Sequence, residues 1–167
     1  MLKFSLGCCV GLAASLLVGT AACAEDAAPR LTIEARLFGS TTGQFSENVL
    51  GPNGPELGNV VMGENASTST FVTVHITAEP PLTAGSKVRL LAVELAGEGQ
   101  TETLPSGGAL LDSAVDVPPT AAGNKDTYVG FWLADTGCTP IALKAELVAP
   151  EAPTASADAT LDFTCHE

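Results

Sequence analysis

The two histidines are the side chains best suited to acid–base catalysis near neutral pH. His75 and His166 each take a polar position in an alternating segment, where a solvent-exposed histidine is the ordinary outcome. Catalysis also needs a nucleophile or a second base beside the imidazole. The sequence has no G-x-S-x-G, H-E-x-x-H or phosphate-binding glycine loop to supply one. We therefore predict no catalytic residues.

Carboxylates are numerous enough to raise the question of a calcium site, because calcium prefers oxygen ligands in loops. No calcium-binding loop signature occurs, so we predict no metal site and expect a solvated acidic surface. A copper site of the two-His, Cys and Met type is also not expected, since no methionine follows Met62. No cofactor is predicted. The candidate calcium ligands are Asp112, Asp116, Asn124, Asp126 and Asp135.

Tyr128 and Trp132 are the only tyrosine and tryptophan, and they stand four residues apart. In a strand this spacing places both rings on one face, about 13 Å apart. Two exposed rings at that separation could stack against sugars, which makes the pair a candidate ligand-binding site. A tryptophan on a central strand of a β-sandwich more often packs in the core. We expect core packing, with a glycan-binding face as the alternative.

The five cysteines divide into those that leave with an export signal and those that stay. Cys8 and Cys9 lie inside an N-terminal apolar run, and Cys23 stands at its end. Cys138 and Cys165 remain as an even pair in an exported domain, where thiols are usually oxidised. We predict a Cys138–Cys165 disulfide. Its loop of about 28 residues would stabilise the fold by roughly 3 to 4 kcal/mol.

Residues 1–24 have the layout of a secretion signal. Lys3 supplies a positive start, and Phe4 to Val18 is an apolar run in which the polar interruptions are serine and glycine. The run could instead serve as an uncleaved anchor, but its end in small residues favours cleavage. The protein is therefore predicted to be exported.

Two cleavage schemes fit the end of this run. Ala22-Cys23-Ala24 matches the small-x-small pattern and would start the mature chain at Glu25. Thr20-Ala21-Ala22-Cys23 resembles the lipobox of bacterial lipoproteins, although that family usually has leucine at the first position. The resemblance implies a diacylated Cys23 as the new N-terminus and, from the alanine that follows, an outer-membrane location. Both schemes stay open.

The net charge of −12 comes from 19 acidic and 7 basic residues. The basic residues are scattered, so no patch for a phosphate backbone can form, and we predict no nucleic-acid partner. Loss of Lys3 with the signal would change the charge from −12 to −13, spread over loop tips and polar strand positions. Membrane contact is expected only through a lipid on Cys23.

Seven segments of the mature chain have strand-type patterns. Residues 30–38, 71–78, 141–148 and 159–166 alternate cleanly between apolar and polar side chains, while 87–96, 110–117 and 127–134 are less regular. The segment 87–96 changes phase, which predicts a bulge or a strand that crosses between sheets. Residues 39–70 lack strong periodicity and favour a weak hairpin or a meandering edge of the sandwich, with a functional binding loop as the alternative.

These patterns predict a two-layer antiparallel β-sandwich, Ig-like or fibronectin-like, with about seven strands and one disulfide. The expected organisation is a signal peptide at 1–24, a linker at 25–29 and one domain at 30–167. We expect a non-catalytic cell-envelope or secreted domain with a structural or interaction role toward an unidentified protein or surface partner. The alternative is a calcium- or glycan-binding module that uses the 39–70 loop or the Tyr128/Trp132 face. A third hypothesis, an enzyme of unrecognised type, would place His75 or His166 in a cleft beside a carboxylate.

Overall fold

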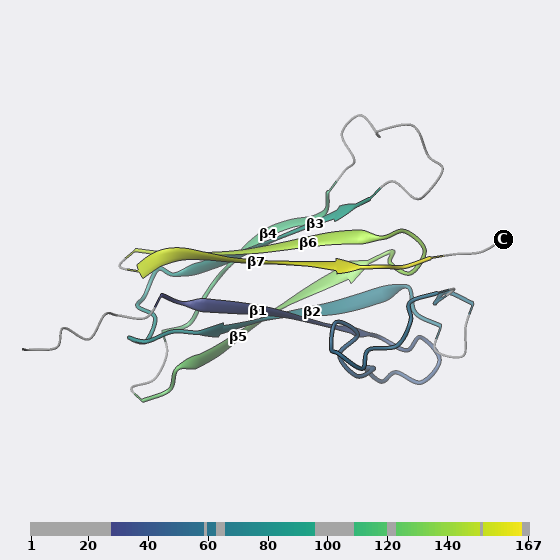
Figure 1. Cartoon of the computed structure of the whole chain (residues 1–167), viewed down its shortest axis with the longest axis horizontal. Coiled ribbons are helices and arrows are strands. Elements are labelled where there is room, and N and C mark those ends of the chain that lie inside the picture. The colour runs from purple at the N-terminus through teal and green to yellow at the C-terminus, as the bar shows by residue number, and fades with distance from the viewer. Residues whose placement is uncertain are drawn as a thin grey trace, which may run out of the picture.

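In the part of the chain that the computed structural model describes, seven antiparallel strands form two facing sheets (Figure 1). The structure describes residues 28–58, 60–62, 66–95, 109–119, 123–150 and 152–164. The predicted signal, Cys23, Cys165 and His166 therefore lie outside the described residues. The strands are β1 (Arg30–Leu37), β2 (Ser69–Thr77), β3 (Lys87–Glu94), β4 (Ala109–Asp116), β5 (Asp126–Ala134), β6 (Ile141–Ala149) and β7 (Ala152–Leu161).

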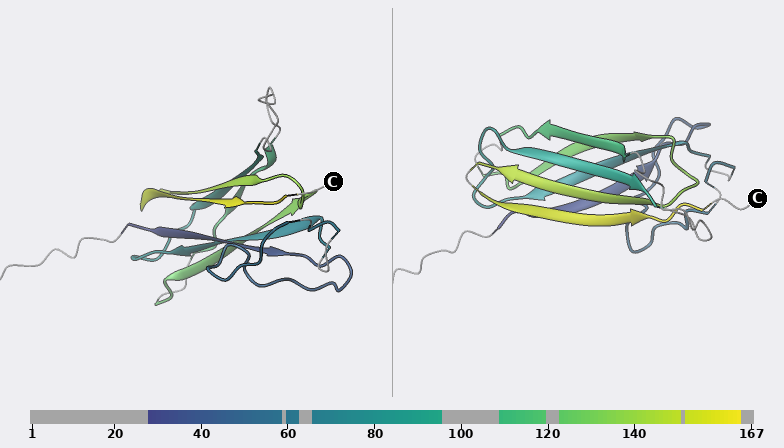
Figure 2. Two further views of the ribbon diagram at one scale, coloured as in Figure 1. Left: turned by 45° about the vertical axis from the view of Figure 1, so that its right-hand side comes forward. Right: turned by 90° about the horizontal axis from the view of Figure 1, so that it is seen from above.

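One sheet has three strands in the order β1-β2-β5, and the other has four in the order β4-β3-β6-β7. Figure 2 shows the four-stranded layer from above, with its strands side by side. Across the sandwich, β1 packs against β7 and β6, while β4 meets β5. The predicted sandwich of seven antiparallel strands is thus confirmed at the level of layers and strand number.

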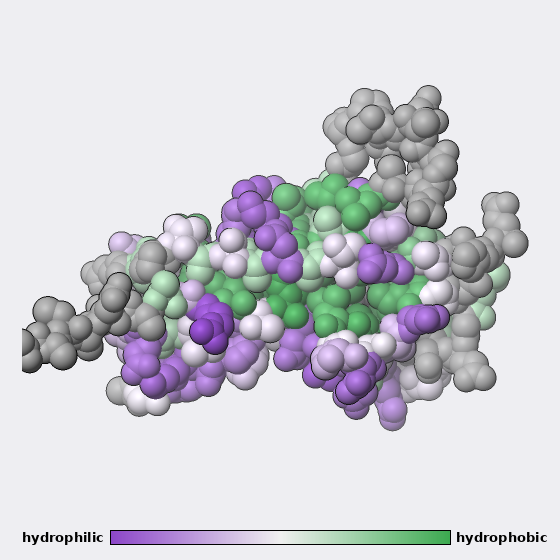
Figure 3. All heavy atoms as spheres, in the orientation of Figure 1, coloured by the Kyte–Doolittle hydropathy of each residue, from purple (hydrophilic) through white to green (hydrophobic). Residues whose placement is uncertain are grey.

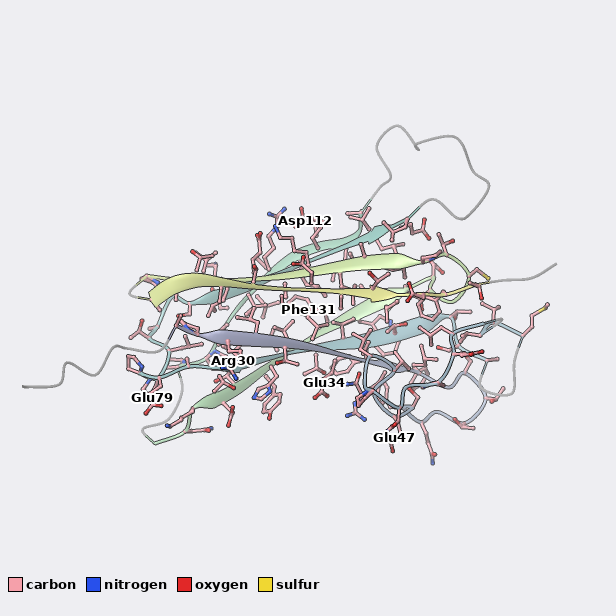
Figure 4. All side chains as sticks on the ribbon, in the orientation of Figure 1. Arg30, Glu34, Glu47, Glu79, Asp112 and Phe131 are labelled. Atoms are coloured by element: carbon pink, nitrogen blue, oxygen red, sulfur yellow. The ribbon has the colours of Figure 1, made fainter. Side chains whose placement is uncertain are left out.

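Alternation along each strand explains why the two sheets pack together. Every second position of β1, β2, β5 and β6 faces inward, because period-2 spacing puts these side chains on one face, and most of them are apolar and buried. Thr70 of β2 is a buried polar exception. Phe131 of β5 lies between the layers (Figure 4). Seen from the side, hydrophobic residues are visible between the sheets, and hydrophilic ones gather on the lower side and on part of the upper side, where hydrophobic residues also show (Figure 3). The polar strand positions therefore face outward.

Strand β3 keeps one phase throughout, contrary to the predicted change. Val88, Leu90 and Ala92 all point into the core with no exposure, whereas Leu91 and Val93 are half-buried on the outer face. The strand does not cross between sheets. The pairing of β3 with β4 does shift register between Ala92 and Val93, so an irregularity of the predicted kind is present in the ladder with β4.

The last strand was expected at 159–166, but β7 covers Ala152–Leu161. Its alternation consists of small residues: Ala155, Ala157 and Ala159 are partly buried against the core. Alanine carries little apolar signal, so a hydrophobic pattern becomes visible only at Leu161. Phe163, beyond the strand, is fully buried as expected from its spacing. The strand begins at Ala152, shortly after the turn at Pro150.

The 39–70 segment lies partly along the open edge of β1, in agreement with the predicted meandering edge. Its backbone bonds to β1 through Ser46 N to Leu37 O at 2.9 Å and Val49 N to Ala35 O at 2.8 Å. The side chains of Ser46 and Asn48 accept the N–H groups of Leu37 and Ala35, at 2.9 and 3.0 Å. Free strand edges invite pairing with other chains. This segment satisfies the edge of β1 at Ala35 and Leu37 from within the molecule.

Candidate functional site

Aromatic side chains gather on the outer face of the three-stranded sheet. Because Val72, Val74 and Ile76 of β2 point inward, Phe71 and His75 must point outward. On β5 the same parity turns Tyr128 and Trp132 outward, with exposed fractions of 60% and 45%. The expectation that this pair packs in the core is therefore wrong. The inward positions of β5 are taken by Val129, Phe131 and Leu133.

Phe71 and Trp132 form one group with two further rings, Phe38 directly after β1 and Phe45 of the long loop. We call these four residues the aromatic cluster. Phe38 meets both Phe45 and Trp132 edge-on with ring centroids 5.5 Å apart. Phe45 lies 5.6 Å from Phe71 and 6.3 Å from Trp132. Such tilted and edge-to-face contacts are the favoured geometries of aromatic pairs. The cluster holds its own shape while Phe45 and Trp132 remain about half exposed.

Gly130 allows the cluster to lie flat on the sheet. It pairs with Thr73 in the ladder between the two aromatic positions of β5. A Cβ atom at this position would stand 2.5 Å from Cζ of Phe71, closer than side chains approach one another. The absence of a side chain at Gly130 thus lets the Phe71 ring extend across β5.

A shallow pocket of about 460 Å³, which we call the loop pocket, adjoins the cluster. Phe45 belongs to both, since its ring contacts the cluster and also lines the pocket. The other pocket side chains are mainly polar and include Thr42, Gln44, Glu47 and Asn53. The structure therefore brings together two features that the sequence suggested separately, the 39–70 loop and Trp132.

His75 and Tyr128 form a second aromatic contact farther along the same face. Their rings stack with centroids 4.5 Å apart and an interplanar angle of 11°. His75 donates from Nε2 to Oδ1 of Asp126 over 2.8 Å, and the hydroxyl of Thr77 donates to the same oxygen over 2.9 Å. The bonds from His75 and Thr77 lower the pKa of Asp126.

This arrangement is not that of a catalytic triad. In a triad the carboxylate bonds to one imidazole nitrogen and the nucleophile's hydroxyl to the other. Here the Asp126 carboxylate is hydrogen-bonded to Nε2 of His75, and the Thr77 hydroxyl donates a hydrogen bond to the same carboxylate over 2.9 Å. The hydroxyl oxygen of Thr77 is 3.5 Å from that Nε2. The hydroxyl is thus not positioned to pass a proton to the imidazole. The contacts fix the orientation of His75 and Tyr128 on the sheet.

The candidate calcium ligands lie apart. Asp112 and Asp116 stand on β4 in ion pairs with basic side chains of β3. Asn124 and Asp126 stand at the start of β5, and Asp135 follows the end of that strand, so about 30 Å of chain separates them. Within the described ranges, no group of three or more His, Cys, Asp or Glu residues could hold a metal ion.

Cys138, the one cysteine in the described part of the chain, lies between β5 and β6 and is disulfide-bonded. Because Cys165 falls outside the described residues, its pairing with Cys138 stays a prediction. None of the described segments is a helix that is long and apolar enough to cross a membrane. The candidate lipidation site at Cys23 also lies outside the described residues.

Sequence reasoning missed three members of the aromatic cluster. Phe38 and Phe71 stand at polar positions of alternating segments, so strand parity already indicated that they point outward. Phe45 lies in a segment without periodicity, and its place beside Trp132 depends on how the loop returns along β1. No known protein family matches this chain, and no curated protein sequence is similar to it.

Proposed function

We propose that this chain is an exported, non-catalytic binding domain that acts at the cell envelope or in the secreted fraction. The observation that carries the proposal is the exposure of the aromatic cluster, with Phe45 at 51% and Trp132 at 45%. Exposed aromatic groups of this kind usually mark interaction sites on soluble domains. The signal-like residues 1–24 support export. His75 does lie beside the carboxylate of Asp126, as the enzyme hypothesis expects, but the hydroxyl of Thr77 donates to that carboxylate and is not placed as a nucleophile for His75.

The strand order supports an Ig-like or fibronectin-like sandwich. In constant-type Ig domains the first, second, fifth and fourth strands share a sheet, opposite the third, sixth and seventh. In this chain β4 lies instead beside β3, which leaves three strands opposite four. Folds of this kind serve as scaffolds for many functions, so the binding role rests on the surface and not on the topology.

The position of the cluster suits presentation to a partner. One end of the three-stranded sheet is marked by Arg30, Thr77 and Asp126, which pair in register. The aromatic cluster lies about 20 to 25 Å along the strands from these residues, toward the other end of the sheet. Figure 4 shows these two ends, with Arg30 near one and Glu47 of the long loop at the other. Arg30 follows Cys23 by seven residues, so a lipid on Cys23 would hold the Arg30 end within about 25 Å of a membrane. The cluster would then lie toward the end of the domain opposite the tether.

The binding role is tested with the mature chain, residues 25–167, labelled and sedimented with cell-envelope fractions of the producing organism. We expect the wild type to bind and Trp132→Ala and Phe45→Ser each to lose about tenfold in affinity, as central aromatic anchors do. Arg89→Ala is the matched control, since Arg89 lies on the outer face of the other sheet. Equal binding by all four proteins, or no binding by the wild type, would contradict the proposal.

Export and anchoring are tested by the intact mass of the native protein. A chain that starts at Cys23 with an added diacylglycerol indicates the lipoprotein route, and an unmodified chain that starts at Glu25 indicates release. A full-length chain with residues 1–24 retained would contradict the proposed processing.

A further inference from the structure

We infer that the aromatic cluster and the loop pocket together form a binding site for a neutral glycan, with Phe45 as the wall that they share. This inference rests on the proposed binding role and names the chemistry of its ligand. Sugars present apolar C–H faces and a rim of hydroxyl groups. A protein site for them therefore needs exposed rings next to polar groups that can donate and accept hydrogen bonds.

The apolar half of the site consists of Phe45 and Trp132. Their centroids are 6.3 Å apart and their planes are inclined by 79°, so the two rings form a corner. Phe38 and Phe71 support that corner through contacts of 5.5 to 6.5 Å. Because neighbouring rings hold both side chains in place, a ligand that stacks on them need not order them first.

The polar half of the site lies in the loop pocket. Gln44 and Asn53 supply amide groups, Glu47 a carboxylate and Thr42 a hydroxyl. Thr42 also accepts the backbone N–H of Gln44 at 3.3 Å, which fixes that turn. Within the described part of the chain, the side chains of Gln44, Glu47 and Asn53 bond to no other protein group. Their donors and acceptors are therefore available to a ligand's hydroxyls.

The charge of the pocket favours a neutral ligand. Its described lining residues include one carboxylate, that of Glu47, and no basic side chain. Phosphates and sulfated sugars are usually bound by arginine or lysine, so an anionic ligand is disfavoured here. A single carboxylate is also too few for a calcium ion, which takes six to eight oxygen ligands.

The form of the pocket favours sugar units over a protein strand or helix. Its volume of about 460 Å³ falls in the range of small-molecule sites. A helix or strand from a protein partner would instead need an extended groove with anchors at regular spacing. The site is thus suited to one or two sugar rings with the rest of a chain leaving over Trp132.

The ligand class is tested by titrating the mature chain with soluble hexasaccharides of glucose, xylose, mannose and N-acetylglucosamine. Trp132 is the only tryptophan, so a change in its emission reports on this site alone. We expect at least one hexasaccharide to bind, and a Gln44→Ala/Asn53→Ala double variant to lose about tenfold in affinity by calorimetry. Both residues are exposed in a loop, so the variant should melt like the wild type. Tyr128→Ala is the matched control on the same face and should bind within about twofold of the wild type.

Three results would overturn the inference, and they separate it from the proposed function. If the domain binds envelope fractions through Trp132 but binds none of the hexasaccharides, the ligand is not a neutral glycan and the binding role stands. If a hexasaccharide binds equally to the double variant, the loop pocket is not part of the site. If neither envelope fractions nor sugars bind, both proposals fail.

Discussion

The two outer faces of this sandwich have the same strand geometry but differ in surface chemistry. On the four-stranded sheet, charged side chains pair across the surface: Lys87 with Asp116 at 3.0 Å, Arg89 with Asp112 at 2.7 Å, and Lys144 with Glu146 at 2.7 Å. Leu91 and Val93 interrupt these pairs toward one end and are half-buried. On the three-stranded sheet, the corresponding surface carries the aromatic cluster and the stacked His75 and Tyr128.

The contrast is one of degree, because Val148 on the four-stranded face is 57% exposed and Arg36 pairs with Glu34 on the three-stranded face. Exposed ion pairs contribute little to stability but keep a surface soluble and discourage strand-edge association. Exposed phenylalanine and tryptophan contribute apolar area that the folded monomer leaves open to solvent. A partner that covers those rings would account for their exposure. The three-stranded face is therefore the one that we assign to binding.

The largest expected effect is a difference in stability between substitutions on the inner and outer faces of β5. Phe131→Ala should destabilise the domain by about 3 to 5 kcal/mol, because it opens a cavity in the core where Phe131 is 5% exposed. Trp132→Ala, one residue away on the outer face, should cost much less stability while it lowers the binding affinity about tenfold. Chemical denaturation of both variants measures the difference. Equal losses of stability would show that the cluster is a second core and not a binding surface.

The next effect concerns the loop that brings Phe45 to Trp132. Asn48 Oδ1 accepts the backbone N–H groups of Ala35 at 3.0 Å and Leu50 at 3.1 Å. Asn48→Ala should cost about 2 kcal/mol, because it leaves the partly buried N–H groups without these acceptors. It should also weaken binding by loosening Phe45, which hydrogen exchange at the β1 edge would reveal. A variant with wild-type stability and exchange would contradict this role. For stability and hydrogen exchange, Asn53→Ala is the control in the same loop.

A smaller effect is expected for Gly130→Ala. The added methyl group would stand 2.5 Å from Cζ of Phe71, so the ring must rotate away from β5. We expect a loss of about 1 kcal/mol and a shift in the emission of Trp132, whose ring centroid lies 6.5 Å from that of Phe71. Unchanged emission would show that the position of Phe71 does not depend on Gly130.

The smallest expected effect is a change in the pKa of one carboxylate on each face. Hydrogen bonds from Arg89 lower the pKa of Asp112, and those from His75 and Thr77 lower the pKa of Asp126, both from an ordinary value of 3.8. A carboxylate whose pKa is lowered by folding stabilises the folded state at pH values above its ordinary pKa. That contribution is lost as the pH falls through the folded-state pKa. Titration by NMR should show both below 3.8. Arg89→Met should raise the pKa of Asp112 alone, and Thr77→Val that of Asp126 alone.

The sequence was sufficient to predict the strands that alternate strongly, because side-chain parity follows directly from strand geometry. It failed for β7, whose alternation is carried by alanines from Ala155 to Ala159. It also placed Trp132 in the core, although Val129, Phe131 and Leu133 already filled the inward positions of the same strand. The contact of Phe45 with Trp132 joins residues 87 positions apart. A contact of that range depends on the path of a loop without periodicity.

Acrylamide quenching of Trp132 most directly tests whether the aromatic face is covered when the domain binds. As the only tryptophan, Trp132 should be accessible in the free protein, where it is 45% exposed. Once the domain is bound to envelope fractions, the quenching constant should fall severalfold. An unchanged constant in protein that has sedimented with its partner would contradict the assignment of this face to binding.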